Sequence, residues 1–368
     1  MKVSSMMKVA MIASFLVPQL GGGRWAAAAS TAPFLGRGAT ASAILPEKDV
    51  VDFAATGGTF LRISFALHPL RDIDPPYAIN EGNMALLDHD IDLCEKYHVR
   101  VIVDPHRFPG VVTSPFTTHA GDPIWSDAHD QDLAVDLWSV IARREAHRGD
   151  VIAGYDLLNE PSLPYMGRKG TLADWNAFAA RMSAAIRAVD PRHTIIIESP
   201  VLVRGDREGI VVNRSESFAS YMAPPSDPNT VYSLHMYEPN EVTFQGLNAR
   251  FSGASDYPAN IGGERWDSWQ MDRFFAPVAA YQKRYGVQIF LGEFSATRWS
   301  GDAGNRYIKD VIEYCEAHHW SWAYTQWRSS DSWDPEKSNT SKDDHQRYPD
   351  TPRLELLKQY WKLGDQLN

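Results

Sequence analysis

Short apolar runs typical of β-strands recur along this 368-residue chain, and stretches with helical spacing of their apolar residues separate them. The stretch 81–98 places its apolar residues on one helical face, and the strand-like run 100–106 follows it directly. With a first strand near 35–44, eight strand candidates alternate with helices, which predicts an α/β fold in which one parallel sheet closes as a (β/α)8 TIM barrel. The remaining strand candidates are 59–65, 151–158, 193–198, 230–239, 287–294 and 320–327.

The length and the charge of the chain narrow its function. One barrel of this type takes roughly 250 residues plus insertions, so a single catalytic domain and a leader account for the chain. The net charge of −10 argues against nucleic acid or an anionic membrane as a partner, and a neutral, polyhydroxylated ligand suits it better. Cys94 and Cys315 both fall in helix-like runs, so we expect buried free thiols and no disulfide framework.

Residues 1–30 differ from the rest of the chain. Lys2 and Lys8 precede the apolar run 9–17, and the alanines at 26–29 offer small residues for cleavage, a pattern that resembles a secretory signal. A disordered N-terminal extension is the alternative. We therefore expect a secreted or periplasmic protein whose catalytic domain spans 31–368 and which has no contact with a membrane after processing.

Two apolar runs end abruptly in a carboxylate. The run 151–158 leads into Asn159, Glu160 and Pro161, and the run 287–294 carries Glu293 near its end. In a closed parallel barrel, strand ends that are distant in sequence face each other across one mouth. The sequence therefore predicts a pair of carboxylates at the C-terminal face of the barrel.

The residue types at the other strand ends indicate what such a pair does. Two carboxyl groups without a cofactor motif favour cleavage of a glycosidic bond, with one group as proton donor and the other as nucleophile. Arg62, in the middle of an apolar strand, is expected to hold Glu293 ionised, and Tyr237 to donate a hydrogen bond to it. We expect the anionic neighbour to raise the pKa of Glu160, so that it keeps its proton as general acid.

Five short motifs stand at these strand ends. They are Leu61-Arg62-Ile63, Asp104-Pro105-His106, Leu157-Leu158-Asn159-Glu160-Pro161, His235-Met236-Tyr237 and Leu291-Gly292-Glu293-Phe294. In order and spacing the set resembles glycoside hydrolase family 5, the cellulase family of clan A. The similarity covers roughly residues 34 to 360, and as a set these motifs are highly specific.

The resemblance implies a role for each matched residue. Glu160 would be the acid/base, Glu293 the nucleophile and Asn159 the partner of the sugar 2-hydroxyl. It also implies net retention of configuration, which goes with carboxyl groups about 5 Å apart. The implied supporting residues are Arg62, His106, His235 and Tyr237.

The end of the eighth strand departs from the family pattern. The family usually places a stacking Trp there, but in this chain Trp322-Ala323-Tyr324 is followed by Thr325. Trp327 or Trp333 is the candidate that supplies the sugar platform instead. The departure concerns the sugar pocket more than the chemistry.

The sequence thus predicts a retaining hydrolase of a β-linked polysaccharide, specifically an endo-β-1,4-glucanase. A β-mannanase, an exo-β-1,3-glucanase or a β-glycosidase on the same barrel are alternatives, and a barrel that binds sugar without cleaving it is an alternative of another class. A metal-dependent hydrolase built from Asp104, His106 and His235 also stays open. We expect no cofactor, no metal, a poly- or oligosaccharide substrate and a monomer.

Overall fold

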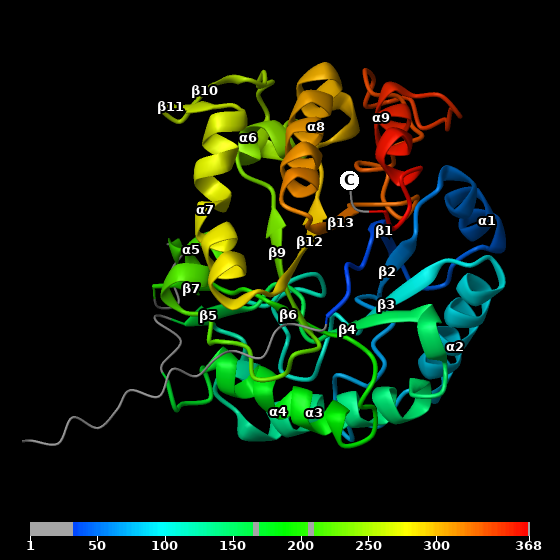
Figure 1. Ribbon diagram of the computed structural model, residues 1–368, viewed down its shortest axis with the longest axis vertical. Helices are drawn as coiled ribbons and strands as arrows, with labels where there is room; N and C mark the ends of the chain where they lie inside the picture. The colour runs from blue at the N-terminus through cyan, green and yellow to red at the C-terminus, as the bar shows by residue number, and fades with distance from the viewer. Residues whose placement is uncertain (1–31, 165–168, 205–209, 367–368) are drawn as a thin grey trace, which may run out of the picture.

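Eight parallel strands close into a barrel in the computed structural model of this chain, which describes residues 32–164, 169–204 and 210–366 (Figure 1). The last strand pairs back onto the first through Arg37 and Trp322, so the predicted (β/α)8 architecture is confirmed. The predicted leader at 1–30 lies outside the described residues. The barrel strands are β1 (Arg37–Ser42), β2 (Phe60–Ser64), β3 (Arg100–Asp104), β4 (Ile152–Asp156), β6 (Ile195–Glu198), β9 (Thr230–Met236), β12 (Gln288–Phe294) and β13 (Ser321–Tyr324).

Helices surround this barrel (Figure 1). In α2, the side chain of Asn80 accepts the backbone N–H of Asn83 and so starts the helix, while Met84, Leu87 and Ile91 face the core at helical spacing. The α-helices are α1 (Glu47–Thr56), α2 (Glu81–Lys96), α3 (Ala128–Glu145), α4 (Trp175–Arg187), α5 (Arg214–Ser220), α6 (Asn240–Thr243), α7 (Ser268–Tyr285), α8 (Gly301–Ala317) and α9 (Pro352–Trp361). The 3₁₀ helices are η1 (Pro123–Trp125), η2 (Gly149–Val151), η3 (Ala249–Phe251) and η4 (Arg298–Ser300).

The interior of the barrel is filled by a small apolar cluster of its own. Seven of the eight strands each contribute one fully or nearly fully buried residue to it, from Phe60 of β2 to Ala323 of β13. The rings of Phe60 and Phe290 meet edge to face across the interior. Because this cluster occupies the barrel interior, polar side chains gather at the C-terminal ends of the strands, where the site lies.

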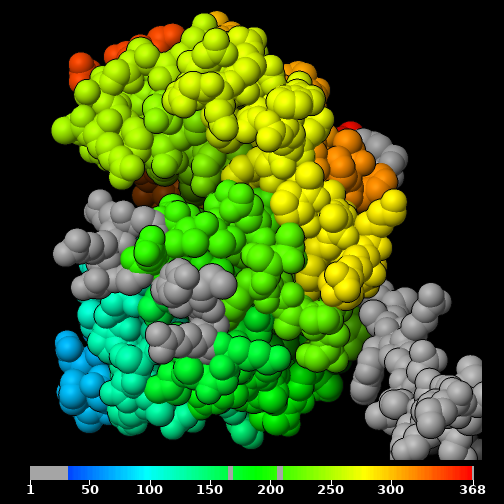
Figure 2. All heavy atoms as spheres, turned by 90° about the vertical axis from the view of Figure 1, so that its left-hand side faces the viewer, coloured from blue at the N-terminus to red at the C-terminus, as the bar shows by residue number. Residues whose placement is uncertain are grey.

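Smaller elements decorate the barrel. One three-stranded sheet consists of β5 (Ser162–Pro164), β7 (Val201–Val203) and β8 (Ile210–Val212). The strands β10 (Ala259–Ile261) and β11 (Glu264–Trp266) form an antiparallel pair in the segment that precedes α7. Figure 2 shows the surface hollowed between this yellow-green segment and the green part of the chain. The two cysteines are free and buried, as predicted. In the described part of the chain, every helix is too short or too polar to cross a membrane.

Candidate active site

Arg62 is the fully buried centre of the site. Its Nε lies 2.7 Å from Asp156 Oδ2, and its Nη1 lies 3.0 Å from Asp104 Oδ2 and 2.9 Å from Glu293 Oε1. Its Nη2 donates to Asn159 Oδ1 at 2.8 Å. Although burial disfavours the charged form, these carboxylates raise the pKa of Arg62 well above its ordinary value. Arg62 thus ties together side chains from or beside β2, β3, β4 and β12.

Glu293 is held from two sides. Arg62 donates to its Oε1, and the hydroxyl of Tyr237 donates to its Oε2 at 2.8 Å. Burial, and then the charge of Glu293, raise the pKa of Tyr237 well above its ordinary value, so the phenol keeps its proton and acts as the donor. The contacts expected from Arg62 and Tyr237 are both present. The carboxylate remains 14% exposed and is therefore open to a ligand.

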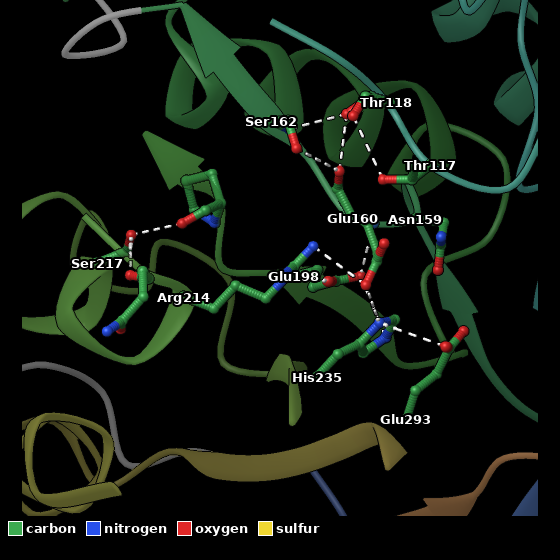
Figure 3. Close-up of polar contacts among 12 residues, drawn as sticks. Thr117, Thr118, Asn159, Glu160, Ser162, Glu198, Arg214, Ser217, His235 and Glu293 are labelled. Atoms are coloured by element: carbon green, nitrogen blue, oxygen red, sulfur yellow. Dashed lines mark hydrogen bonds and ion pairs between the residues drawn. The ribbon is translucent and has the colours of Figure 1, made fainter. Parts of the chain in front are cut away.

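Glu160 sits on a left-handed backbone, with φ of 48°, just beyond the end of β4. Its N–H donates to Glu198 Oε2 at 3.0 Å, and its carbonyl accepts the hydroxyl of Thr118 at 2.7 Å (Figure 3). Thr118 in turn accepts the N–H of Ser162 at 2.8 Å. These hydrogen bonds stabilise a conformation that costs about 1–3 kcal/mol for a residue with a side chain, and they aim Glu160 into the site.

The carboxylate of Glu160 faces two cations. Its Oε1 lies 3.1 Å from Nδ1 of His235 and 3.1 Å from Nη2 of Arg214. Burial acts to raise the pKa of Glu160, but Arg214 and His235 outweigh it, and the net effect is a pKa below the ordinary value. The expectation of a raised pKa is therefore wrong for the free enzyme, because it considered only the anionic neighbour and missed the cation from α5.

His235 connects the two carboxylates. Its Nδ1 lies 3.1 Å from Glu160 Oε1 and 3.7 Å from Glu293 Oε2, so those two oxygens are no further apart than these distances added together. That limit is compatible with the separation of about 5 Å in retaining enzymes. Burial disfavours the imidazolium, but Glu198 and the two carboxylates raise the pKa of His235 to about 9. His235 is thus a hydrogen-bond donor at neutral pH.

Glu198, the last residue of β6, is a third carboxyl group in the site. It is fully buried, and its oxygens lie 3.4 Å from Nε2 of His235 and 3.4 Å from Nε of Arg214. Burial raises the pKa of Glu198 to about 7, even though both cations oppose the shift. Glu198 ends the predicted strand 193–198, but no role was predicted for it. Its signal was an acidic residue closing a β-branched run.

Within the described ranges, Glu160, Glu198 and His235 form one group whose donor atoms lie within 4.8 Å of one another, as a metal site requires. Arg214 contacts both of these carboxylates, so a guanidinium already supplies the positive charge that a metal ion would bring. The alternative site of Asp104, His106 and His235 does not form. Asp104 pairs with Arg62 and His106, whereas His235 turns to Glu160 and Glu198.

His106 and Asn159 share one backbone acceptor. His106 Nδ1 lies 2.6 Å from Asp104 Oδ2, its Nε2 lies 3.0 Å from the carbonyl of Phe116, and Asn159 Nδ2 donates to the same carbonyl at 2.9 Å. Burial opposes the charged imidazole, but Asp104 raises the pKa of His106 above its ordinary value. The structure therefore brings both predicted residues to the site, next to the segment that carries Phe116.

A cavity of about 450 Å³ opens beside Glu293. Phe116, Thr325 and Trp333 line it, and Trp333 also contacts Tyr237, with ring centroids 6.2 Å apart. This places Trp333 where a sugar platform is expected. The expectation for Trp327 is wrong, because β13 ends at Tyr324 and the ring of Trp327 is buried elsewhere.

Trp327 packs beneath α1. Its Nε1 donates to the carbonyl of Asp49 at 2.9 Å, and its ring meets those of Phe53 and Trp361. Only 1% of the residue is exposed. Trp327 is therefore part of the core.

Comparison with known proteins places the chain in a family. The model of "Cellulase (glycosyl hydrolase family 5)" matches residues 29–331. A cellodextrinase A of Ruminococcus flavefaciens is 25% identical over 67% of this chain and 68% of its own length. A β-xylosidase of Phanerodontia chrysosporium is 28% identical over 75% of this chain, and an endoglucanase C of Acetivibrio thermocellus 26% identical over 55% of it. The matches span 55% and 52% of those two proteins, about half of their lengths.

Solved structures agree on the fold. An endoglucanase of Thermotoga maritima superposes with a TM-score of 0.62 at 22% identity, over 82% of this chain and 92% of its own. At that identity the likeness concerns the barrel alone. The match to the family model covers most of the chain and spans the positions of Glu160 and Glu293. The chain therefore belongs to glycosyl hydrolase family 5, the cellulase family, and it is a glycoside hydrolase.

Proposed function

We propose that this protein hydrolyses β-linked glucans with net retention of configuration, with Glu293 as nucleophile and Glu160 as acid/base. The observation that supports this most directly is the pair of partly exposed carboxylates that both contact His235. Arg62 and Tyr237 orient Glu293, whereas His235 and Arg214 hold Glu160.

The first step requires the protonated form of Glu160: Glu293 attacks the anomeric carbon while Glu160 transfers its proton to the leaving oxygen. The glycosidic bond breaks, a glycosyl ester forms on Glu293, and the leaving sugar departs as an alcohol. In the second step, Glu160, now ionised, takes a proton from water, and the water oxygen attacks the anomeric carbon. The ester bond breaks, and both carboxyl groups return to their starting states.

The sugar that Glu293 attacks lies in the cavity beside it, because the nucleophile must reach the anomeric carbon. Thr40 offers this cavity a buried hydroxyl that has no hydrogen-bond partner among the described residues, and Trp333 offers an aromatic face. The names of two relatives, a cellodextrinase and an endoglucanase, support β-1,4-glucan as the substrate and endo cleavage as the specific proposal. Mannan and β-1,3-glucan remain the alternatives.

A panel of polysaccharides tests this proposal. The purified protein is incubated with carboxymethyl cellulose, mixed-linkage glucan, laminarin, mannan and xylan, with and without a chelator, and reducing ends are measured. We expect cleavage of a β-1,4-linked glucan that the chelator leaves unchanged, with oligosaccharides of mixed length as products. Proton NMR of the first product should show the β-anomer before mutarotation. Binding of oligosaccharide without any product would contradict the proposal and support the non-catalytic barrel.

We also propose that residues 1–30 direct export and are removed, because their charge and apolar pattern match a secretory signal. N-terminal sequencing of protein recovered from the medium or the periplasm of an expressing bacterium tests this. A start within the small residues at 26–29 or shortly after them is the expected result. Retention of Met1 in the mature protein would contradict it.

A further inference from the structure

Arg214 reaches the site from outside the barrel. It is the first residue of α5, which is anchored by side-chain hydrogen bonds to neighbouring backbone. The hydroxyl of Ser217 donates to the carbonyl of Pro200 at 2.5 Å, and that of Ser215 donates to the carbonyl of Phe274. The short helix therefore gives the long side chain of Arg214 a fixed base, from which it points at Glu160 (Figure 3).

The guanidinium of Arg214 bridges two carboxyl groups. Its Nη2 lies 3.1 Å from Glu160 Oε1 and its Nε lies 3.4 Å from Glu198 Oε1, while only 17% of its side chain is exposed. Glu198 itself is fully buried and accepts the backbone N–H of Glu160. Glu198 thus holds both the backbone of the acid/base and the cation that faces its carboxylate.

The other charged and titratable groups around Glu160 come from several elements. His235 contacts the carboxylate directly, from β9. Other groups that act on it or on its two cations include Asp104, Asp156, Glu198, Tyr237, Glu238 and Glu293. The charge of Arg214 favours the ionised form, and His235 favours it both through its hydrogen bond and through its charge. A change at Arg214 should therefore alter the charge state of Glu160 while the hydrogen bond from His235 stays in place.

The two steps of the reaction make opposite demands on Glu160. It must carry a proton when the leaving group departs and must be ionised when water attacks. A guanidinium at 3.1 Å favours the ionised form. We propose that Arg214, held by Glu198, is a positioning residue that keeps Glu160 in its proton-accepting form and so favours the step in which water is activated. This inference rests on the role proposed for Glu160.

The substitution Arg214→Gln removes the charge at this position but keeps a polar side chain. In Arg214→Gln the acid/base loses one of the two cations that lie 3.1 Å from its carboxylate, so the pKa of Glu160 should rise. The alkaline limb of kcat/KM on a substrate with a poor leaving group should then move up by about one pH unit or more, because Glu160 keeps its proton to higher pH. Arg214→Lys retains the charge and should keep the limb nearer its original position.

The second step of the reaction, hydrolysis of the glycosyl enzyme, provides a second pH dependence that Arg214→Gln should shift. On an aryl glycoside with an activated leaving group, release of the glycosyl enzyme limits kcat, and this step requires ionised Glu160. The acidic limb of kcat should therefore also move to higher pH in Arg214→Gln. A purely structural defect would lower the rate without moving either limb. Arg143→Gln, which removes an exposed arginine from α3, is the matched control.

A titration without substrate separates this inference from the proposed function. Protein labelled with δ-¹³C-glutamate is followed by NMR across pH, and the Glu160 signal is identified by its loss in Glu160→Gln. We expect the midpoint of this signal to rise in Arg214→Gln and to rise less in Arg214→Lys. An unchanged midpoint, or unmoved limbs in a folded and active variant, would overturn the inference. A parent enzyme that cleaves no glycoside would overturn the proposed function and leave the titration of Glu160 valid.

Discussion

The two carboxylates of the site depend on different parts of the molecule. Glu293 is held by Arg62 and Tyr237, which come from β2 and from the residue directly after β9. Glu160 also relies on the barrel through His235, but its second cation, Arg214, comes from α5, and its carbonyl is held by a loop residue. The nucleophile is thus supported by barrel residues alone, whereas the acid/base is supported by both the barrel and its decorations.

This difference fits the chemistry proposed for each group. A nucleophile serves the reaction in one protonation state, and contacts from a rigid sheet can supply that state. An acid/base has to change its state within each cycle, so its charge environment decides the balance between the steps. An arginine on a short accessory helix can set this balance without any change to the strands that build the barrel.

The largest expected effect lies on the nucleophile side. Glu293→Gln keeps the size of the side chain but removes the attacking carboxylate, so kcat/KM should fall by about 10⁴-fold or more on every substrate. Circular dichroism should remain that of the parent. The loss should be the same for activated and poor leaving groups. Substantial remaining activity would mean that Glu293 is not the nucleophile, and the contrast between the supports of nucleophile and acid/base would then not hold.

On the acid/base side the loss should depend on the substrate. Glu160→Gln should lower kcat/KM about 10³-fold when the leaving group is a sugar, because protonation then limits the first step. With a dinitrophenyl leaving group, which needs little acid assistance, the loss in kcat/KM should be much smaller. Equal losses on both substrates would mean that Glu160 does not act as general acid.

The smallest expected effects distinguish a tryptophan that lines the cavity, Trp333, from one that is buried in the core, Trp327. Trp333→Ala should raise KM by about 10-fold with little change in the free energy of unfolding, because this ring lines the cavity. Trp327→Ala should instead lower the free energy of unfolding by about 3–5 kcal/mol, because this ring is buried against Phe53 and Trp361. Denaturant unfolding and initial rates measure the two quantities. A raised KM with unchanged stability in Trp327→Ala would instead mean that Trp327 contacts the substrate.

Much of the barrel could be predicted from the sequence because its strands are short apolar runs between amphipathic helices. The residues at the strand ends then converge for a geometric reason, as the carboxyl ends of parallel strands meet at one face. Arg62, Asn159, Glu160 and Glu293 all gather there, as expected. This prediction required only the alternation of strand-like and helix-like runs, together with the polar residues in or just after the strands.

The decorations could not be predicted in the same way. Arg214 lies in a segment without apolar periodicity, and its contact with Glu160 depends on how α5 packs against α7. The prediction for Trp327 was wrong because the aromatic run continues in sequence beyond Tyr324, whereas the strand ends at that residue and the chain leaves the barrel. Asp104 and Asp156 did carry a signal, since each ends an apolar strand, and both serve Arg62.

The sharing of Arg62 among three carboxylates has a consequence for the covalent intermediate. In the proposed mechanism Glu293 becomes an ester and loses its negative charge. An arginine paired with Glu293 alone would then be left as a buried cation without compensation, at a cost of several kcal/mol. Asp104 and Asp156 lie 3.0 and 2.7 Å from the same guanidinium and form no bond to the sugar in that step. In the proposed intermediate Arg62 would therefore keep two carboxylate partners, and its buried charge would stay compensated while the sugar is bound to Glu293.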